Sequence, residues 1–345
     1  MKKRILAVLM TAILAVSLTA CGGGETNETA AEKNDFKVGL VTDVGGVEDQ
    51  SFNQSAWEGL CRAEEEFGIT VNYLASTTDA DYAPNIETFI DEEYDLIICV
   101  GYMLAEATRT AAEANPDQMF AIVDDSSCSD LDNVACLMFK QEQASYLVGY
   151  VAGMMTEKDK VGLVLGMASE NMHLFGYGYC AGVLDANPAA SILQANANSF
   201  GDPALGSSLA TNFITNGADI IFHAAAATGT GVISECDAKD IMAIGVDSDQ
   251  NYLAPETVIT SAMKRVDNAV FDSAKKLVEG TLGAGVTVYD LSNAGVDIAP
   301  TTTLLTDDVV AAVEDVKEKI IAGEIEVPTT QEAFEAAYGD VYELD

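Results

Sequence analysis

Short apolar runs alternate with amphipathic segments along most of the chain from Lys37 onward. Apolar strands separated by helices are typical of parallel sheets that are covered by helices on both faces. The alternation therefore predicts an α/β fold. The predicted strands are 38–42, 70–74, 95–100, 119–123, 134–138, 161–165, 192–194, 219–222, 241–245 and 258–260.

The segment after the first strand has apolar residues at helical spacing, and Gly68 supplies a stop signal for it. These apolar residues are Phe52, Ala56, Leu60, Ala63 and Phe67. Other predicted helices end at breaker pairs, which are Asn115-Pro116, Asn187-Pro188 and Asn216-Gly217.

Ten predicted strands divide more naturally into two sheets of five than into one sheet. The seam is expected at 140–160, where a predicted helix at 141–155 precedes a new series of strands. We expect one lobe at 36–140 plus about 264–300, and a second at 141–263 plus about 301–345. A helix at 306–322 should pack on a lobe, and "VPTTQEAFEAAYGDVYELD" is expected to be a peripheral acidic tail.

The N-terminus has the pattern of a leader, with the cations Lys2, Lys3 and Arg4 before a mainly apolar run at 5–18. An ordinary secretory signal or a membrane helix would share these features, but a membrane span needs about 20 apolar residues. "LTAC" resembles a bacterial lipobox, in which cleavage precedes Cys21 and its thiol is acylated. We therefore expect a lipoprotein signal peptide at 1–20, a flexible linker at 21–35 and an extracytoplasmic, membrane-anchored protein.

The chain has a formal net charge of −38. Nucleic-acid binding needs Lys and Arg to neutralise phosphates, so this balance argues against such a partner. Without a C-x-x-C pair and with two histidines, the sequence predicts neither a zinc site nor another cofactor. The sequence leaves open whether Cys128 and Cys136 form a disulfide. The protein is expected to be a monomer.

Ligands of open α/β sheets bind beyond the carboxyl ends of the strands. Residues just after the predicted strands are therefore candidates for a shared cleft. They are Asp43, Gly101-Tyr102, Asp124-Asp125, Gly166-Met167, His223 and Asp247. Ionised carboxylates accept hydrogen bonds and suit vicinal hydroxyls such as those of ribose, but not a phosphorylated ligand.

Other positions have two interpretations each. Ser51 is better explained as a helix cap than as a ligand contact. Phe52 is a core residue or a stacking ring, and Lys264 is an exposed lysine or a donor to a ligand. "HAAAATGTGV" offers backbone access at Gly229, but it lacks a dinucleotide fingerprint and a P-loop.

We expect no enzymatic activity, because the chain has no G-x-S-x-G elbow, no H-E-x-x-H motif and no evident Cys–His pairing. The clustered acids leave one enzymatic alternative open, a surface hydrolase that would use Asp43, Asp49 and Asp247.

Six linked motifs resemble those of the basic membrane protein (BMP) family of substrate-binding lipoproteins, the purine nucleoside receptor group. They are "VGLVTDVGGVEDQSFNQSAWEGL", "FGYGYCAG", "FGDPALG", "GADIIFHAAAATGTGV", "IGVDSDQ" and "TSAMKRVD", in order from Lys37 to about Gly280. The resemblance implies a type I periplasmic-binding fold, whose two lobes close on a nucleoside and deliver it to the permease and ATPase of an ABC transporter.

The resemblance also implies a set of ligand-binding residues. Asp247 would accept hydrogen bonds from ribose hydroxyls, Asp124 would lie beside the base, and Lys264 would donate nearby. The remaining implied residues are Asp43, Phe52, Asn53, Phe175, Phe200 and Gly229.

Two loops depart from the family pattern. Gly166 is followed by Met167 rather than a second glycine, and "HAAAATGTG" has alanines where many relatives have glycines. Both loops belong to the second lobe, so a riboflavin-like or ribose-like ligand, or a sensing rather than transporting role, stays open.

Overall fold

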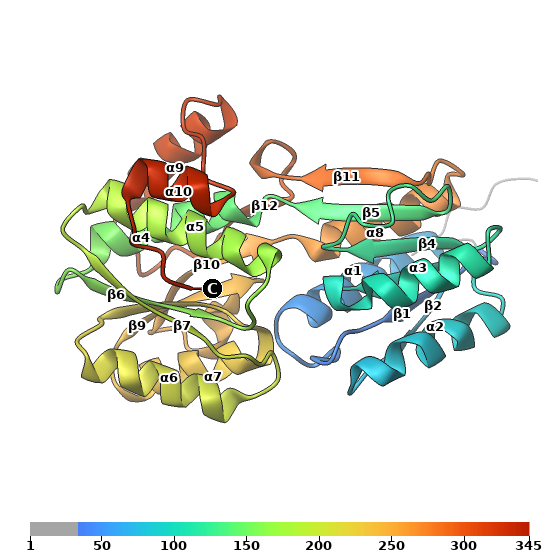
Figure 1. Cartoon of the computed structure of the whole chain (residues 1–345), viewed down its shortest axis with the longest axis horizontal. Helices are drawn as coiled ribbons and strands as arrows, with labels where there is room; N and C mark the ends of the chain where they lie inside the picture. The colour runs from blue at the N-terminus through green and yellow to red at the C-terminus, as the bar shows by residue number, and fades with distance from the viewer. Residues whose placement is uncertain (1–33, 345) are drawn as a thin grey trace, which may run out of the picture. The chain divides into compact units, whose positions relative to one another are not determined.

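The computed structural model describes residues 34–344, which contain two sheets flanked by helices (Figure 1). The first sheet has the strand order β11-β5-β4-β3-β1-β2, and its pairings are all parallel. Its strands are β1 (Lys37–Val41), β2 (Thr70–Leu74), β3 (Leu96–Val100), β4 (Met119–Val123), β5 (Val134–Phe139) and β11 (Gly285–Tyr289).

The second sheet has the order β12-β10-β9-β8-β6-β7. Its strands are β6 (Lys160–Leu165), β7 (Ser191–Asn196), β8 (Ile220–Ala224), β9 (Met242–Asp247), β10 (Val258–Lys264) and β12 (Val296–Ile298). β12 runs antiparallel to β10, and the other pairings are parallel.

Helices cover both faces of each sheet, as buried parallel strands require. The first sheet carries α1 (Phe52–Phe67) and α8 (Val266–Val278) on one face, and α2 (Tyr82–Asp91) and α3 (Ala105–Ala114) on the other. The second carries α4 (Gln141–Met155), α5 (Glu170–Ala186) and α9 (Asp307–Ile321) on one face, and α6 (Pro203–Thr215) and α7 (Ala226–Ala238) on the other. We call these two assemblies lobe 1 and lobe 2; α10 (Gln331–Tyr338) packs on α5.

Glycines bring α4 and α5 close together. An added Cβ on Gly149 of α4 would overlap with the Tyr179 carbonyl of α5, and one on Gly182 of α5 would overlap with the Tyr146 carbonyl of α4. The backbones therefore approach more closely than larger residues would permit, which fixes the position of α5.

The ten predicted strands are confirmed, as are the helix ends at Gly68, Asn115, Asn187 and Asn216. Gly68 has φ of +65°, and its N–H donates to the Glu64 carbonyl, as expected of a C-terminal cap. The prediction of five strands in each sheet is wrong, because β11 and β12 each add one. Both are edge strands, and they are short or partly exposed, so neither has a continuous apolar run.

The strand pairing differs from one of the expected lobe boundaries. α8 and β11 lie in the first lobe, but β12 pairs with β10 in the second sheet, although about 264–300 was expected in the first. The chain therefore returns to the second sheet between Tyr289 and Val296. The remaining boundaries stay predictions.

The C-terminal segment differs from the expected peripheral tail. α9 matches the predicted helix at 306–322, but the residues beyond it also contribute to the core. Phe334 and Tyr342 are buried, with exposed fractions of 0% and 2%. Their rings pack around Tyr177 of α5, which explains why an acidic sequence is held against lobe 2.

All six cysteines within residues 34–344 are free thiols, so Cys128 and Cys136 are not joined in this structure. No helix in that range is long and apolar enough to cross a bilayer. The expected leader at 1–20 and the expected lipid site Cys21 lie outside the described residues.

Candidate functional site

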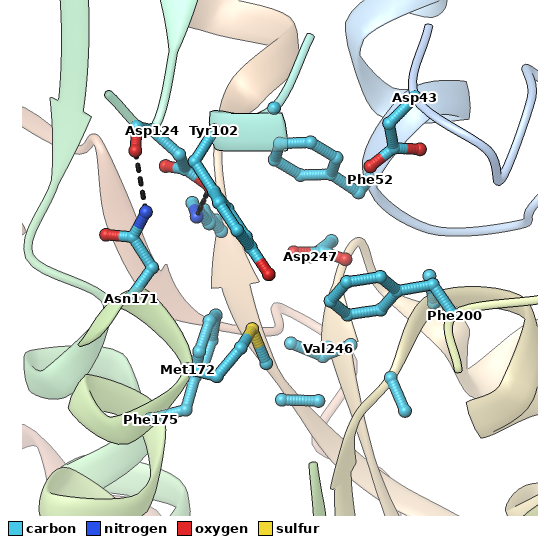
Figure 2. A pocket seen from close by; sticks show the side chains of 15 residues that line it. Asp43, Phe52, Tyr102, Asp124, Asn171, Met172, Phe175, Phe200, Val246 and Asp247 are labelled. Atoms are coloured by element: carbon cyan, nitrogen blue, oxygen red, sulfur yellow. Dashed lines mark hydrogen bonds and ion pairs between the residues drawn. The ribbon is translucent and has the colours of Figure 1, made fainter. Parts of the chain in front are cut away.

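A pocket lies where the carboxyl ends of strands from both sheets meet (Figure 2). Both lobes contribute to its wall. The lining residues are Asp43, Phe52, Gly101, Tyr102, Asp124, Asn171, Met172, Phe175, Phe200, Ala224, Ala225, Ala226, Val246, Asp247 and Lys264. Its position agrees with the strand-end rule for open α/β sheets.

Asp43 follows β1 and is held by groups from the loop and from α1. Its Oδ1 accepts hydrogen bonds from the Gly45 N–H at 2.9 Å and from Asn53 Nδ2 at 2.7 Å. Burial raises the pKa of the Asp43 carboxyl to about 6, although both hydrogen bonds oppose this change. Asn53 therefore lies behind Asp43 and supports it, and it is not one of the lining residues.

Asp49 caps the N-terminus of α1. Its Oδ1 accepts from the backbone N–H groups of Ser51 and Gln54, and its Oδ2 accepts from that of Asn53. Ser51 occupies the N-cap position of α1, but its side chain makes no capping bond, so the capping role predicted for its hydroxyl is wrong. Because Asp49 satisfies these amides, the Ser51 hydroxyl is free to donate to Asp247 Oδ2 in the other lobe.

Asp124 and Asp247 occupy equivalent places in the two sheets. Asp124 follows β4 with φ of +66°, and Asp247 ends β9 with φ of +64°. Non-glycine residues seldom adopt such angles, and those that do are often aspartates at functional turns. Burial raises the pKa of Asp247 to about 7, although Lys264 and the bond from Ser51 oppose this change.

Lys264 forms a buried ion pair across the lobes. Its Nζ lies 2.5 Å from Asp124 Oδ2, and the two side chains are 3% and 9% exposed. The ammonium is also 5.2 to 5.5 Å from the ring centroids of Phe52, Phe139 and Phe175. Rings at this distance attract a cation electrostatically, so the charge is held by one carboxylate and three aromatic side chains.

Further hydrogen bonds join the lobes beside this pair. Asn171 Nδ2 donates to the Asp124 carbonyl at 2.6 Å, and Gln250 Nε2 donates to the Gln50 carbonyl at 2.9 Å. Together with the Ser51–Asp247 bond, they hold the lobes against each other around the pocket.

Aromatic rings form much of the remaining wall, as Figure 2 shows for Phe52, Tyr102, Phe175 and Phe200. Phe200 lies directly over Gly166, where an added Cβ would overlap with the ring. The glycine after β6 therefore makes room for an aromatic side chain. The Phe200 ring offers a flat face to a ligand.

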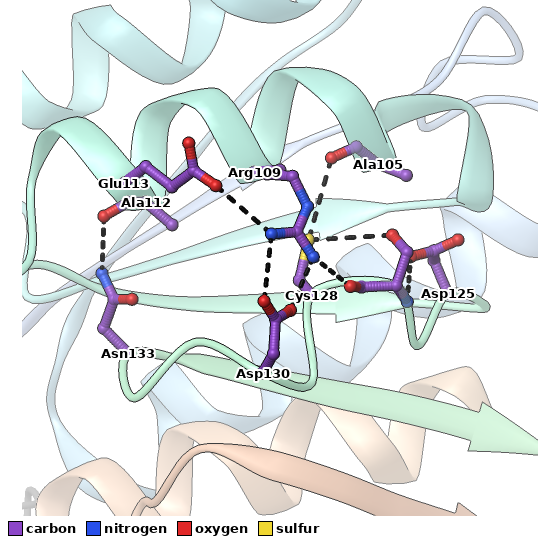
Figure 3. A network of polar contacts seen from close by, with 9 residues as sticks. Ala105, Arg109, Ala112, Glu113, Asp125, Cys128, Asp130 and Asn133 are labelled. Carbon is purple, nitrogen blue, oxygen red and sulfur yellow. Dashed lines mark hydrogen bonds and ion pairs between the residues drawn. The ribbon is translucent and has the colours of Figure 1, made fainter.

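The loop that carries Asp124 is fixed to α3 by Arg109 (Figure 3). The guanidinium donates to the Ser127 carbonyl and to Asp130 Oδ1, the latter at 2.6 Å. Asn133 Nδ2 donates to three backbone carbonyls near the end of α3, at 3.0 to 3.1 Å. These contacts join the loop to α3 through residues that do not line the pocket.

Seven predicted site residues lie together in the pocket wall: Asp43, Phe52, Asp124, Phe175, Phe200, Asp247 and Lys264. Gly229 does not, because it lies within α7 against the His223 ring, and an added Cβ there would overlap with that ring. The Gly229 backbone, which was expected to be accessible to a ligand, is therefore not part of the pocket wall.

The strand-end rule also named Gly101 and Tyr102, which follow β3 directly, as cleft candidates without a role, and both lie in the wall. Sequence reasoning passed over the other lining residues. Asn171 and Met172 are in the first turn of α5, and no signal in the sequence separates them from other helical residues. Ala224, Ala225, Ala226 and Val246 line the wall with small apolar side chains.

The pocket combines hydrogen-bond acceptors with flat apolar faces. Such a combination suits a ligand that has both a ring system and hydroxyl groups. Among residues 34–344, no group of three or more His, Cys, Asp or Glu side chains is arranged to hold a metal ion. His223, whose ring lies against Gly229, is fully buried, and burial lowers its pKa to about 4.

Two lobes of this topology, with a pocket at the carboxyl ends of both sheets, define the type I periplasmic-binding class. A solved structure supports this: an ABC transporter solute-binding protein from Aeropyrum pernix K1 has a TM-score of 0.80 and 27% identity, over 90% of this chain and 100% of that chain.

Residues 36–331 match the Bmp family, described as ABC transporter substrate-binding protein PnrA-like. The CD4+ T-cell-stimulating antigen of Listeria innocua is 38% identical, over 95% of this chain and 99% of the relative. The ABC transporter nucleoside-binding protein BmpA of Lactococcus lactis is 35% identical, over 95% of this chain and all of the relative. The chain therefore belongs to the Bmp family of ABC transporter substrate-binding proteins, which confirms the resemblance seen in its motifs.

Proposed function

We propose that this protein captures nucleosides, and purine nucleosides in particular, by closing its lobes and then presents the ligand to an ABC permease. The observation that carries the proposal is the buried Asp247 carboxylate, which lies beside Lys264 in a pocket walled by aromatic rings. The name of the Lactococcus lactis relative, a nucleoside-binding protein, supports the same ligand class.

In this proposal Asp247 accepts hydrogen bonds from the two ribose hydroxyls, because an ionised carboxylate has acceptor capacity for both. Phe52, Tyr102 and Phe200 offer faces to the base. Asp43 and Asp124 present acceptors to the polar edge of the base. A phosphate group is disfavoured, because three carboxylates line the pocket and Lys264 already pairs with one of them.

Lobe closure is the proposed mechanism. In this mechanism the closed state gains the contacts between the lobes over an open one, among them Lys264–Asp124, Ser51–Asp247, Asn171–Asp124 and Gln250–Gln50. A ligand that adds further contacts to both lobes shifts the equilibrium toward the closed state. The permease would then recognise closed protein.

The test is calorimetry with a soluble form that starts at Gly22, partly unfolded and refolded to remove bound ligand. We expect inosine, guanosine or adenosine to bind more tightly than cytidine or uridine, and ribose and riboflavin to bind weakly. Tight binding of riboflavin or ribose alone would replace the proposed ligand. The absence of heat and of a thermal shift with every nucleoside would reject the ligand class.

We also propose that the protein binds its ligand without changing it. Recovery of intact nucleoside after prolonged incubation is the expected result, whereas free base would support the hydrolase alternative with Asp43, Asp49 and Asp247. Reduced uptake of labelled nucleoside by cells that lack the gene would separate transport from sensing.

Anchoring through Cys21 completes the proposal. The leader pattern supports it, and two archaeal relatives are named lipoproteins. Labelled fatty acid should be incorporated into the full-length protein but not into a Cys21→Ala variant. Equal labelling of both would refute this site.

A further inference from the structure

We infer that the C-terminal segment Gln331–Leu344 is a clasp that holds the first half of α5 in its ligand-binding position, with Tyr342 as the positioning residue. This inference rests on the proposed function, because α5 supplies part of the pocket wall. The segment was expected to be peripheral, and its contacts are the reason to assign it a role.

The first half of α5 presents two faces. Asn171, Met172 and Phe175 line the pocket, whereas the next face around the helix carries His173, Gly176 and Tyr177. Residues three and four apart share one face of a helix, so this second set forms a continuous strip. The strip faces the C-terminal segment rather than the pocket.

Tyr342 covers this strip at its centre. Its hydroxyl lies 2.8 Å from His173 Nδ1, and its ring packs edge-on against Tyr177 with centroids 4.8 Å apart. The ring also occupies the space above Gly176, where an added Cβ would overlap with it. Phe334 of α10 stacks on Tyr177 from the same side.

The clasp is itself held at its far side. Gln194 of the edge strand β7 donates from Nε2 to the Val341 carbonyl at 2.7 Å and accepts from the Glu343 N–H at 3.2 Å. Gln331 Nε2 donates to the Tyr342 carbonyl at 3.5 Å. Tyr342 is therefore fixed from both directions along the chain.

α5 needs such support because its interior contains Gly176, Gly178 and Gly182, and glycine weakens a helix relative to alanine. Gly178 and Gly182 pack against α4, but Gly176 packs against Tyr342. The clasp thus covers the glycine nearest the pocket. Movement of this turn would displace Phe175, which contacts the Lys264 ammonium, and Asn171, which bonds to the Asp124 carbonyl.

The chain offers a matched control for Tyr342. Tyr338 also belongs to the C-terminal segment, and its hydroxyl donates to Asp185 Oδ2 at 3.0 Å. Asp185 is at the other end of α5, twelve residues beyond His173, which corresponds to about 18 Å along the helix. Tyr342→Phe and Tyr338→Phe therefore each remove one hydroxyl bond to α5, one near the pocket and one far from it.

The experiment measures nucleoside affinity by calorimetry and melting temperature without ligand, using the full-length protein and both variants in detergent. We expect Tyr342→Phe to weaken binding about three- to tenfold, the size of one net hydrogen bond, and Tyr338→Phe to change it less than twofold. Both variants should melt at similar temperatures. Equal affinities for the two variants would overturn the inference, because a purely structural role would affect both alike.

Hydrogen exchange separates this outcome from failure of the proposed function. If the wild-type protein binds no nucleoside, the proposed function is wrong, and the clasp is then judged by amide exchange without ligand. We expect the amides of 172–177 to exchange faster in Tyr342→Phe than in Tyr338→Phe. Equal exchange rates there would overturn the clasp.

Discussion

β1 to β5 of lobe 1 and β6 to β10 of lobe 2 are arranged in the same order, yet the residues at their carboxyl ends differ. β3 is followed by Gly101 and Tyr102, whereas the equivalent β8 is followed by Ala225 and Ala226. Asp43 follows β1, but Met167 holds the corresponding place after β6.

The two lobes have an aspartate at the same structural position. Asp124 and Asp247 end equivalent strands with nearly equal positive φ, but Asp124 forms an ion pair with Lys264, whereas Asp247 accepts a hydrogen bond from Ser51. The comparison indicates that Asp124 joins the lobes through an ion pair, whereas Asp247 makes a single hydrogen bond across them and keeps further acceptor capacity for a ligand. The following predictions test this division.

The largest expected effect is on stability. Lys264→Met leaves Asp124 buried without its cation, which should lower the free energy of unfolding by about 3–5 kcal/mol, measured by urea denaturation without ligand. Adding Asp124→Asn should recover part of this loss, because the two residues interact directly. A single-variant loss below about 1 kcal/mol would contradict the closing role of the pair.

The second effect is on binding. Asp247→Ala should weaken nucleoside binding about 10- to 150-fold, because charged hydrogen bonds contribute about 1.5–3 kcal/mol, and calorimetry measures the change. The fold should persist, since burial already disfavours the ionised carboxylate. Asp249→Ala is the matched control: Asp249 bonds to Thr301 outside the pocket wall, so affinity should change less than twofold. Wild-type affinity in Asp247→Ala would reject the assigned role.

The third effect is the pH dependence of binding. Burial raises the pKa of Asp247 to about 7, and in the proposed binding mode its carboxylate is ionised when it accepts from two ribose hydroxyls, so ligand binding should release a proton. Affinity should therefore fall as pH decreases, by about tenfold between pH 8 and pH 6. Calorimetry over this range tests the slope, which should be flatter in Asp247→Ala. An equal slope in both proteins would assign the titration to another group.

The smallest effect concerns the backbone of lobe 2. Ala226 has φ of +46°, whereas lobe 1 places a glycine, Gly101, at its own positive-φ position after β3. Ala226→Gly should raise the free energy of unfolding by about 0.5–1 kcal/mol, because glycine adopts this conformation without strain. The control is Ala225→Gly, whose φ of −147° offers no such relief. A gain in stability in both variants would point to another cause.

Much of the fold and part of the site could be predicted from local pattern. Most of the ten strands were found because they are short apolar runs. β12 has only three residues, and in β11 exposed Val286 and Val288 alternate with more buried positions, so neither forms such a run. Asp43 and Asp247 were found because the strand-end rule depends on local position. Tyr102 satisfied the same rule, but nothing local distinguishes a lining tyrosine from a surface one.

The wrong interpretations share a physical cause. Ser51 was interpreted as a side-chain cap because serine often precedes a helix. Gly229 was interpreted as part of a ligand loop because it belongs to a run of small residues after a strand. In the structure Asp49 satisfies the amides of α1, and Gly229 makes room for the buried His223 ring. Which of several suitable neighbours makes a contact depends on packing, which no local pattern reports.

The sequence by itself determined the alternation of strands and helices, the division into two sheets, the leader pattern and the acids at the strand ends. Only the tertiary structure decided which acid pairs with Lys264, that Ser51 bonds to Asp247, and that Tyr342 covers α5. The Lys264–Asp124 and Ser51–Asp247 contacts join residues 140 and 196 positions apart. Helical and strand periodicity describe neighbours along the chain, whereas such contacts depend on how the two lobes meet.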